Sequence, residues 1–182
     1  MTSPIDANVV KGFAAFAKLT LEEADMVAQL LESQNLARGE TLFRQGDASD
    51  AIYLIITGEM EILLRVANHD DHHLVTLGSG TIFGEVAPLA DECRTATATA
   101  LTEVSLARLP WSALESGLEN SERWAVKFLL HTSQVLARRL RAVNDQFAAT
   151  LAKIDSKSLS SPAHTEDELD SLRRRLLKDW SF

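Results

Sequence analysis

Residues 40–66 read ETLFRQGDASDAIYLIITGEMEILLRV. The segment consists of short runs rich in β-branched and aromatic residues, separated by Gly and Asp, which is typical of strands joined by tight turns. Runs of this kind continue to residue 109, and they are separated by glycines at positions 39, 46, 58, 78, 80 and 84. Glycine readily takes the positive φ that many turns require. The pattern predicts a β-sandwich or jelly-roll barrel of about eight short strands within residues 35–110.

The segments on either side of the strands have helical features, so an α+β fold is expected. Thr20 and Glu23 have the spacing of a capping box, and apolar residues follow at helical intervals, which predicts an N-terminal helical segment over residues 1–34. After Pro110, Ser112 and Glu115 predict a second capping box for a short helix, and Asn120 or Ser121 is expected to cap a long one. Residues 111–155 are therefore predicted to form C-terminal helices.

The predicted long helix carries a mostly apolar stripe at alternating spacings of four and three residues. Its members are Leu129, Ser133, Leu136, Leu140, Val143, Phe147, Thr150 and Ile154. This spacing is typical of a coiled-coil seam and predicts a homodimer through residues 129–154. The alternative is that the helix folds back along its own domain.

The end of the chain is predicted to form a linker and one more helix. Residues 156–164, SKSLSSPAH, have the Ser-rich composition of a linker. Residues 165–182 predict an amphipathic tail helix with apolar residues opposite three consecutive arginines. This helix is expected to dock on a protein partner, on its own domain or on anionic lipid.

Composition favours a soluble, cytoplasmic protein. The 182 residues are 46% apolar and 24% charged, as in ordinary globular domains. No apolar run is long enough to cross a membrane and the N-terminus does not resemble a signal peptide, so membrane association is not expected. The single cysteine, Cys93, excludes an internal disulfide. The net charge of −8 argues against general affinity for nucleic acid.

Residues 81–100, TIFGEVAPLADECRTATATA, contain the candidate ligand-binding residues. The residues from Val86 to Ala90 can form one or two helical turns, and the free N–H groups at such a helix start attract anions. Arg94 offers a bidentate fork suited to phosphate. Glu85 accepts hydrogen bonds only, so it would repel a phosphate but could hold a hydroxyl. Donors for phosphate and one carboxylate for a sugar hydroxyl predict a nucleotide site.

The stretch GEVAPLADECRTA at residues 84–96 resembles the phosphate-binding cassette of cyclic nucleotide-binding domains, as in the catabolite activator protein and the regulatory subunits of cyclic-nucleotide-dependent kinases. Residues 36–64 resemble the opening strands of that family, including a Phe–x–Gln–Gly–Asp turn, and ARRLRAVN at 137–144 resembles its long C-terminal helix. The resemblance covers about residues 10–150. It implies a receptor that binds cAMP or cGMP as a ligand, with no other cofactor.

The resemblance also implies roles for individual cassette residues. Gly84 lets the backbone approach the ligand, and Glu85 binds the ribose 2′-hydroxyl. The Ala87 N–H and Arg94 bind the cyclic phosphate, and Val86 belongs to the same ligand-binding turn. Thr95 contacts the phosphate or the purine. Threonine there is similar to cGMP-dependent kinases and channels, whereas serine is common in bacterial cAMP receptors, so base preference is open.

Further ligand contacts are expected outside the cassette. Ile62 with Leu74 or Val75 is expected to form an apolar wall against the base. Val143 and Asn144 match the place where the long helix of the family caps the purine, in the same chain or across a dimer. The cassette lacks the glycine often found before its arginine, and the Asp91–Glu92 pair in its place would weaken phosphate binding unless it points to solvent.

Other functions have less support in the sequence. The histidine-rich run at residues 69–73 predicts a solvated turn, and no metal is expected. Only 28 residues follow Ile154, too few for the helix-turn-helix of DNA-binding relatives, so DNA binding is not expected. No nucleophile–base pair is visible, so no enzymatic activity is expected. The leading hypothesis is a receptor that signals through its C-terminal helices to an unknown protein partner. The alternative is an interaction module that kept the fold and lost the ligand.

Overall fold

The computed structural model describes residues 5–65 and 71–158, with side chains described up to residue 149. The chain divides into two compact units, Met1–Ser133 and Gln134–Phe182. The first unit contains all the strands and the first turns of the last helix, and the second contains the rest of that helix. The predicted tail helix at 165–182 lies outside the described residues.

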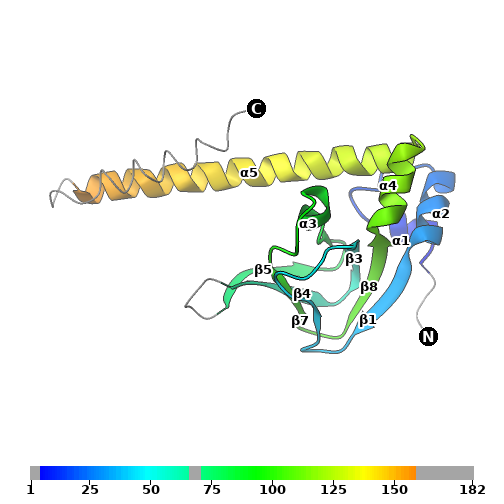
Figure 1. Cartoon of the computed structure of the whole chain (residues 1–182), viewed down its shortest axis with the longest axis horizontal. Helices are drawn as coiled ribbons and strands as arrows, with labels where there is room; N and C mark the ends of the chain where they lie inside the picture. The colour runs from blue at the N-terminus through cyan, green and yellow to red at the C-terminus, as the bar shows by residue number, and fades with distance from the viewer. Residues whose placement is uncertain (1–4, 66–70, 159–182) are drawn as a thin grey trace. The chain divides into compact units, whose positions relative to one another are not determined.

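Eight strands form two four-stranded antiparallel sheets, as predicted (Figure 1). The first sheet has the order β1-β8-β3-β6 and the second β2-β7-β4-β5. Their bounds are β1 Glu32–Leu36, β2 Thr41–Phe43, β3 Ala51–Thr57, β4 Glu59–Leu64, β5 His72–Gly78, β6 Ile82–Phe83, β7 Thr97–Ala100 and β8 Val104–Pro110. Strand β1 begins at Glu32, before residue 35, where the first strand was expected to begin. The prediction missed this start because the residues ESQNL are mostly polar and do not alternate with apolar ones.

The described residues also form five helices: α1 Ala7–Lys11, α2 Leu21–Leu30, α3 Val86–Leu89, α4 Trp111–Glu119 and α5 Arg123–Ser158. The capping box that opens α2 is confirmed: the Glu23 N–H donates to Thr20 Oγ1 at 3.1 Å, and the Thr20 N–H donates to Glu23 Oε2 at 2.9 Å. Helix α5 extends to Ser158, so residues 156–158 are helical where a linker was predicted.

The two other predicted caps are wrong. Helix α4 begins at Trp111, whose N–H donates to the Asp50 carbonyl at 2.8 Å, so a tertiary contact and Pro110 fix its start and Ser112 lies inside the first turn. Helix α5 begins at Arg123. Asn120 ends α4, because its side-chain amide donates to the Ser116 carbonyl at 2.8 Å.

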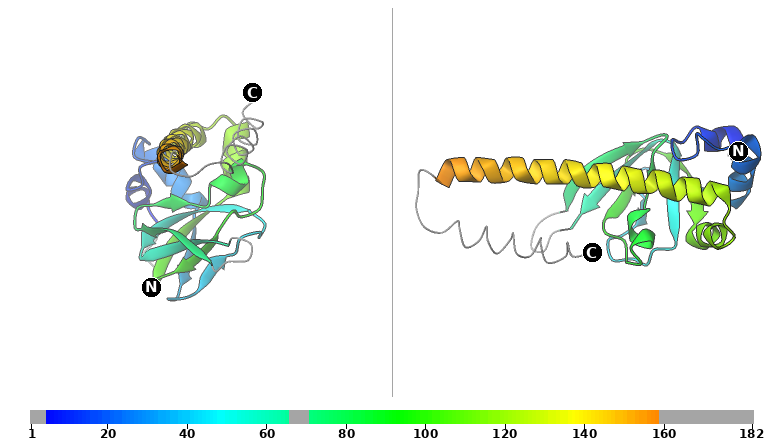
Figure 2. Two further views of the ribbon diagram at one scale, coloured as in Figure 1. Left: turned by 90° about the vertical axis from the view of Figure 1, so that its left-hand side faces the viewer. Right: turned by 90° about the horizontal axis from the view of Figure 1, so that it is seen from above.

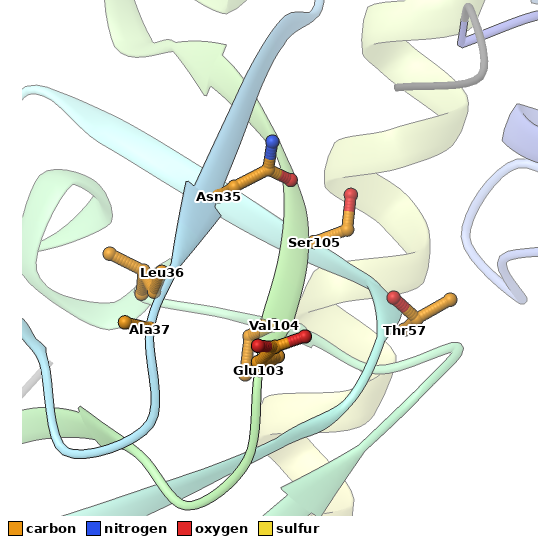
Figure 3. A pocket seen from close by; sticks show the side chains of 7 residues that line it. All are labelled: Asn35, Leu36, Ala37, Thr57, Glu103, Val104 and Ser105. Atoms are coloured by element: carbon orange, nitrogen blue, oxygen red, sulfur yellow. The ribbon is translucent and has the colours of Figure 1, made fainter. Parts of the chain in front are cut away.

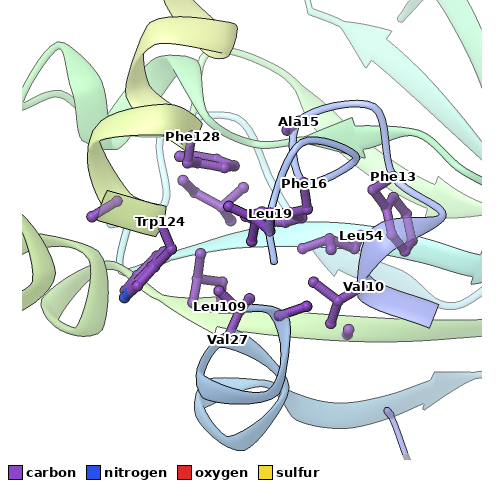
Figure 4. Packing of buried hydrophobic residues seen from close by; sticks show 14 of the residues in the cluster. Val10, Phe13, Ala15, Phe16, Leu19, Val27, Leu54, Leu109, Trp124 and Phe128 are labelled. Carbon is purple, nitrogen blue, oxygen red and sulfur yellow. The ribbon is translucent and has the colours of Figure 1, made fainter. Parts of the chain in front are cut away.

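Strand β3 separates two apolar clusters. Ile52 and Leu54 point to one side, where they pack with helices α1, α2 and α4 and the start of α5 (Figure 4). Tyr53 and Ile55 point into the space between the two sheets. Successive side chains of a strand face opposite ways, so a strand covered on both faces is apolar throughout. This explains the continuous run AIYLII.

The N-terminal helices are tied to the start of α5 by aromatic packing. The rings of Phe16 and Phe128 stack with centroids 5.2 Å apart, and Trp124 and Phe128 are buried in the same cluster as Val27 (Figure 4). Both views of Figure 2 show the N-terminal helices beside the start of α5. Lys127 also donates to Glu23 of α2 at 2.6 Å. The first turns of α5 are therefore part of the folded domain. Within the described ranges, no helix is long and apolar enough to cross a membrane.

Candidate nucleotide-binding site

Gly84 occupies a position that only glycine fits without strain. It follows β6 directly and has φ +78°. A Cβ atom there would lie 2.9 Å from Arg94 Nη1 and 3.4 Å from Cδ2 of the Tyr53 ring. Both the backbone conformation and the space around it exclude a larger side chain. Gly84 therefore lies in close contact with the arginine of the cassette, and the approach of its backbone to a ligand stays a prediction.

Helix α3 is a single turn that begins directly after Glu85. The Leu89 N–H donates to the Glu85 carbonyl at 3.2 Å, and the Ala90 N–H donates to the Val86 carbonyl at 3.1 Å. The amides of Val86 and Ala87 belong to the first turn, whose N–H groups have no acceptor within a helix. Ala87 is buried, whereas Val86 is 39% exposed. Glu85 is buried at the start of this turn, with 4% of its surface exposed.

Arg94 is buried between the cassette and the barrel, with 3% of its surface exposed. Its Nη1 donates to the Gly84 carbonyl and its Nη2 to the Ala51 carbonyl, both at 2.8 Å. The guanidinium carbon lies 4.3 Å from the centroid of the Phe43 ring and 5.5 Å from that of Tyr53, within cation–π range. Burial lowers the pKa of Arg94, because desolvation disfavours the charged form.

One of the three guanidinium nitrogens of this arginine has no hydrogen-bond partner. Arg94 Nε is buried and has no hydrogen-bond partner. A buried N–H without an acceptor is costly, and the cost is larger for a charged group. The two carbonyl contacts and the Phe43 ring hold the side chain in place, so the unpaired donor has a fixed position. Such an arrangement is suited to an anionic ligand.

The turn that follows β2 holds the backbone of Arg94. The Gly46 N–H donates to the Arg94 carbonyl, and the Arg94 N–H donates to the Asp47 carbonyl, both at 2.8 Å. This pair of bonds explains the Phe–x–Gln–Gly–Asp sequence in structural terms. The aromatic residue covers the guanidinium and the turn fixes the main chain.

The acidic pair that precedes Arg94, unlike Glu85, lies on the solvent side of the cassette. Asp91, Glu92 and Cys93 are all exposed. Asp91 has φ +55°, the left-handed conformation in which aspartate is tolerated better than most residues. The missing glycine before the arginine is thus replaced by an aspartate in a glycine-like conformation.

The residues predicted to form the base wall lie on β4 and β5. Ile62 pairs with Val75 across β4–β5 and packs against the cluster between the sheets. Val75 is 44% exposed and Leu74 52%. A register shift after Ile62 leaves Leu74 without a direct cross-strand partner. Thr95 is exposed beside Arg94 in sequence.

Val143 and Asn144 lie in the second unit of the chain, and Val143 is 62% exposed. Their role at the purine stays a prediction.

Three neighbours of Arg94 were given no role from the sequence. They are Phe43, Tyr53 and the Ala51 carbonyl. Phe43 belongs to the quoted turn motif, so its proximity to the cassette could have been inferred from the resemblance. Ala51 and Tyr53 lie in a strand that reads as ordinary core, and nothing in their sequence pattern points to an arginine.

A pocket of about 460 Å³ lies elsewhere on the first sheet. Asn35, Ser105 and Thr57 form a row across it, because Ser105 is the register partner of both others (Figure 3). It contains none of the predicted ligand-binding residues. Among the described residues, no group of three or more His, Cys, Asp or Glu could hold a metal ion. His69 and Asp70 of the histidine-rich run lie outside the described residues.

The fold and the cassette define a β-roll domain with a buried arginine at a single-turn helix. Residues 33–121 match the cyclic nucleotide-binding domain family, so the chain contains a domain of this family.

Relatives of known role support this assignment. A CRP-like cAMP-activated global transcriptional regulator of Mycobacterium tuberculosis is 32% identical over 118 residues, which are 65% of this chain and 51% of that protein. A cAMP-dependent protein kinase regulatory subunit of Blastocladiella emersonii is 37% identical over 87 residues, 48% of this chain and 22% of that one. The crystal structure of Thermus thermophilus catabolite activator protein superposes with a TM-score of 0.67 at 26% identity, covering 75% of this chain and 62% of that one. The chain thus spans about half of the bacterial regulator.

Proposed function

We propose that the chain is a receptor for a 3′,5′-cyclic purine nucleotide, cAMP or cGMP. Arg94 and the amides of Val86 and Ala87 bind the cyclic phosphate, and Glu85 binds the ribose 2′-hydroxyl. The observation that carries the proposal is the buried Arg94 side chain, fixed by two carbonyls and an aromatic ring, with Nε unpartnered.

The charges of the site suit a phosphodiester. A cyclic phosphate has one negative charge. A guanidinium that is buried without an ionic partner is costly, and a phosphate bound beside it offsets that cost. The first-turn amides add neutral donors beside it. Glu85 repels a phosphate but accepts a hydrogen bond from a hydroxyl. The site would therefore bind the ribose phosphate in one orientation, with the 2′-hydroxyl at Glu85 and the phosphate at Arg94. Exposure of Asp91 and Glu92 leaves their charges screened by solvent.

The base is proposed to lie against Ile62, Val75 and Leu74, with Thr95 near the phosphate or the purine. Val143 and Asn144 of α5 would close over it, from the same chain or a second copy. The exposed surfaces of Val75 and Leu74 are available to a planar apolar ligand.

The receptor is proposed to act by binding alone, in the cytoplasm and without catalysis. Ligand binding would shift the population of α5 and tail conformations and so change contact with a protein partner. Homodimerisation through residues 129–154 is part of this proposal, because Leu140, Val143 and Phe147 are 55%, 62% and 40% exposed. Apolar residues at these heptad positions are suited to a second helix.

The alternative is an interaction module that kept the fold and lost the ligand. Its main support was the acidic pair in the cassette, and the exposure of both residues weakens that argument. Mass spectrometry of small molecules released from the purified chain, followed by calorimetric titration with cAMP and cGMP, separates the two functions. The receptor predicts saturable binding of at least one nucleotide and weaker binding of 5′-AMP. Absence of binding to both would favour the interaction module.

A further inference from the structure

The turn at residues 44–47 is a junction between three parts of the domain. It holds the cassette through the two backbone bonds between Gly46, Asp47 and Arg94. It is closed internally by Asp47, whose Oδ2 accepts from the Arg44 N–H at 2.7 Å. The remaining residue of the turn, Gln45, takes no part in either set of contacts. Its own bonds go to β7 and to the end of β4.

Gln45 anchors the turn on both sides. Its main-chain N–H donates to Thr97 Oγ1 on β7 at 3.0 Å. Its side-chain Oε1 accepts from the Arg65 N–H at 2.8 Å, and its Nε2 donates to the Arg65 carbonyl at 3.4 Å. A primary amide offers the same donor and acceptor as a peptide group. The Gln45 side chain therefore continues the hydrogen-bond ladder of β4 in place of a neighbouring strand.

Through these contacts the Gln45 side chain supports the turn that pairs with the main chain of Arg94, the residue proposed to bind the phosphate. Without the Gln45 amide, the turn loses its connection to β4, and the Arg94 main chain is paired to a turn that can shift. We propose that Gln45 is a positioning residue: by anchoring the turn it sets the place of Arg94 relative to the barrel and so the geometry with which the site contacts the phosphate. The inference rests on the proposed function only for the identity of the ligand. The hydrogen bonds of Gln45 are observed in the structure.

Gln45 should affect the binding of the phosphate and should not affect the binding of the base. Arg65 is linked to Asp71, next to β5, by an ion pair of 3.1 Å whose side chains are 71% and 37% exposed. Exposed ion pairs contribute little. Loss of Gln45 should thus leave the Leu74 and Val75 surface, and any preference between bases, unchanged.

Hydrogen exchange in the ligand-free chain tests the anchor directly. Gln45→Met removes the amide at similar volume, and Gln29→Met, on the exposed face of α2, is the matched control. We expect the Gly46 and Arg94 amides to exchange at least about fivefold faster in Gln45→Met, because the substitution removes both side-chain hydrogen bonds to Arg65. In Gln45→Met, the amides of β3 should exchange at the wild-type rate. In Gln29→Met, all amides should do so. Unchanged exchange at Gly46 and Arg94 would overturn the inference.

Binding of phosphorothioates tests the consequence. The Rp and Sp phosphorothioate analogues of cAMP replace one or the other exocyclic oxygen by sulfur, so a fixed arginine distinguishes them. The ratio of their dissociation constants should fall towards one in Gln45→Met, while the ratio between cAMP and cGMP stays constant. A preserved Rp/Sp ratio, even with lower affinity and lower Tm, would show a merely structural residue and overturn the inference.

Two further outcomes are distinguishable. A wild-type chain that binds neither nucleotide overturns the proposed function, and with it the phosphate role of Gln45, whatever the exchange rates. If Gln45→Met does not fold, Gln45→Ala gives the same test, because it also removes both side-chain hydrogen bonds to Arg65. It should accelerate exchange at Gly46 and Arg94 in the same direction, and failure to do so would overturn the anchor.

Discussion

The guanidinium of Arg94 lies 4.3 Å from the centroid of the Phe43 ring, although 51 positions separate the two residues in the sequence. The ring covers one face of the charged group while the Gly84 and Ala51 carbonyls take two of its donors. The side chain is therefore held before any ligand arrives. Preorganisation of this kind reduces the ordering cost of binding.

Replacement of the Phe43 ring should weaken the hold on Arg94. We expect Phe43→Leu to lower the affinity for the cyclic nucleotide about twofold to thirtyfold, since a cation–π contact contributes about 0.5–2 kcal/mol. Phe83→Leu is the control, because Phe83 lies in the same aromatic cluster, with its ring 6.2 Å from that of Phe43. Calorimetry gives both affinities. Equal losses in the two variants would argue for general loosening of the core and against a specific contact.

Gly84 and Gly80 allow strain to be separated from contact. Both have positive φ, +78° and +83°, but a Cβ at Gly84 meets Arg94 Nη1 at 2.9 Å whereas a Cβ at Gly80 meets nothing within 4 Å. Both Gly→Ala variants should lose about 1 kcal/mol of stability or more from the backbone alone. Only Gly84→Ala should also lose nucleotide binding, by at least about tenfold, because Arg94 must move. Nucleotide binding that survives in Gly84→Ala would contradict the geometry of the site.

The link between α2 and α5 should depend on pH. The hydrogen bond from Lys127, followed by that from the Thr20 amide, lowers the pKa of Glu23 below its ordinary value of 4.5. A carboxyl whose pKa is lowered by folding adds stability above its unfolded pKa and loses it as pH falls through the folded pKa.

Lys127→Met should therefore lower the Tm at pH 7, and the difference from the wild type should shrink as the pH falls below about 4.5. Thermal melts at several pH values measure it, with Arg38→Met, at an exposed position, as a control. A Tm difference that is constant from pH 7 to pH 3 would exclude the charge of Glu23 as its cause.

The apolar positions of α5 should control association. Leu140→Ser combined with Phe147→Ser should convert a dimer to a monomer in analytical ultracentrifugation, because both residues lie on the proposed seam. Ala142→Ser combined with Ala149→Ser changes the same helix away from the seam and should leave the dimer intact. A wild-type chain that sediments as a monomer would contradict dimerisation through residues 129–154.

Much of the fold follows from local sequence. The strands with apolar runs and the Thr20 capping box were predictable, because their signals lie within a few residues of one another. Strand β1 was misplaced because it is an edge strand with a polar sequence. The starts of α4 and α5 were misplaced because a contact from Trp111 to Asp50 and the use of Asn120 by the preceding helix override the local capping signal.

The candidate site was predictable in composition but not in its internal contacts. Glycine, glutamate and arginine with this spacing indicate phosphate chemistry, and the resemblance names the ligand. The contacts of Arg94 with Phe43 and the Ala51 carbonyl depend on how two distant strands meet, since Ala51 and Arg94 are 43 positions apart. The Gln45 anchor to Arg65 is likewise a product of the tertiary fold.

Calorimetric titration of the wild type and of Arg94→Ala with cAMP and cGMP tests the central claim most directly. We expect the wild type to bind at least one of them with a dissociation constant of about 1 μM, equivalent to about −8 kcal/mol. Arg94→Ala should bind at least about tenfold more weakly, because the phosphate charge loses its buried partner, while Arg44→Ala, at an exposed position of the neighbouring turn, should bind nearly as the wild type. Equal affinity of Arg94→Ala and the wild type, or no binding to the folded wild type, would contradict the account.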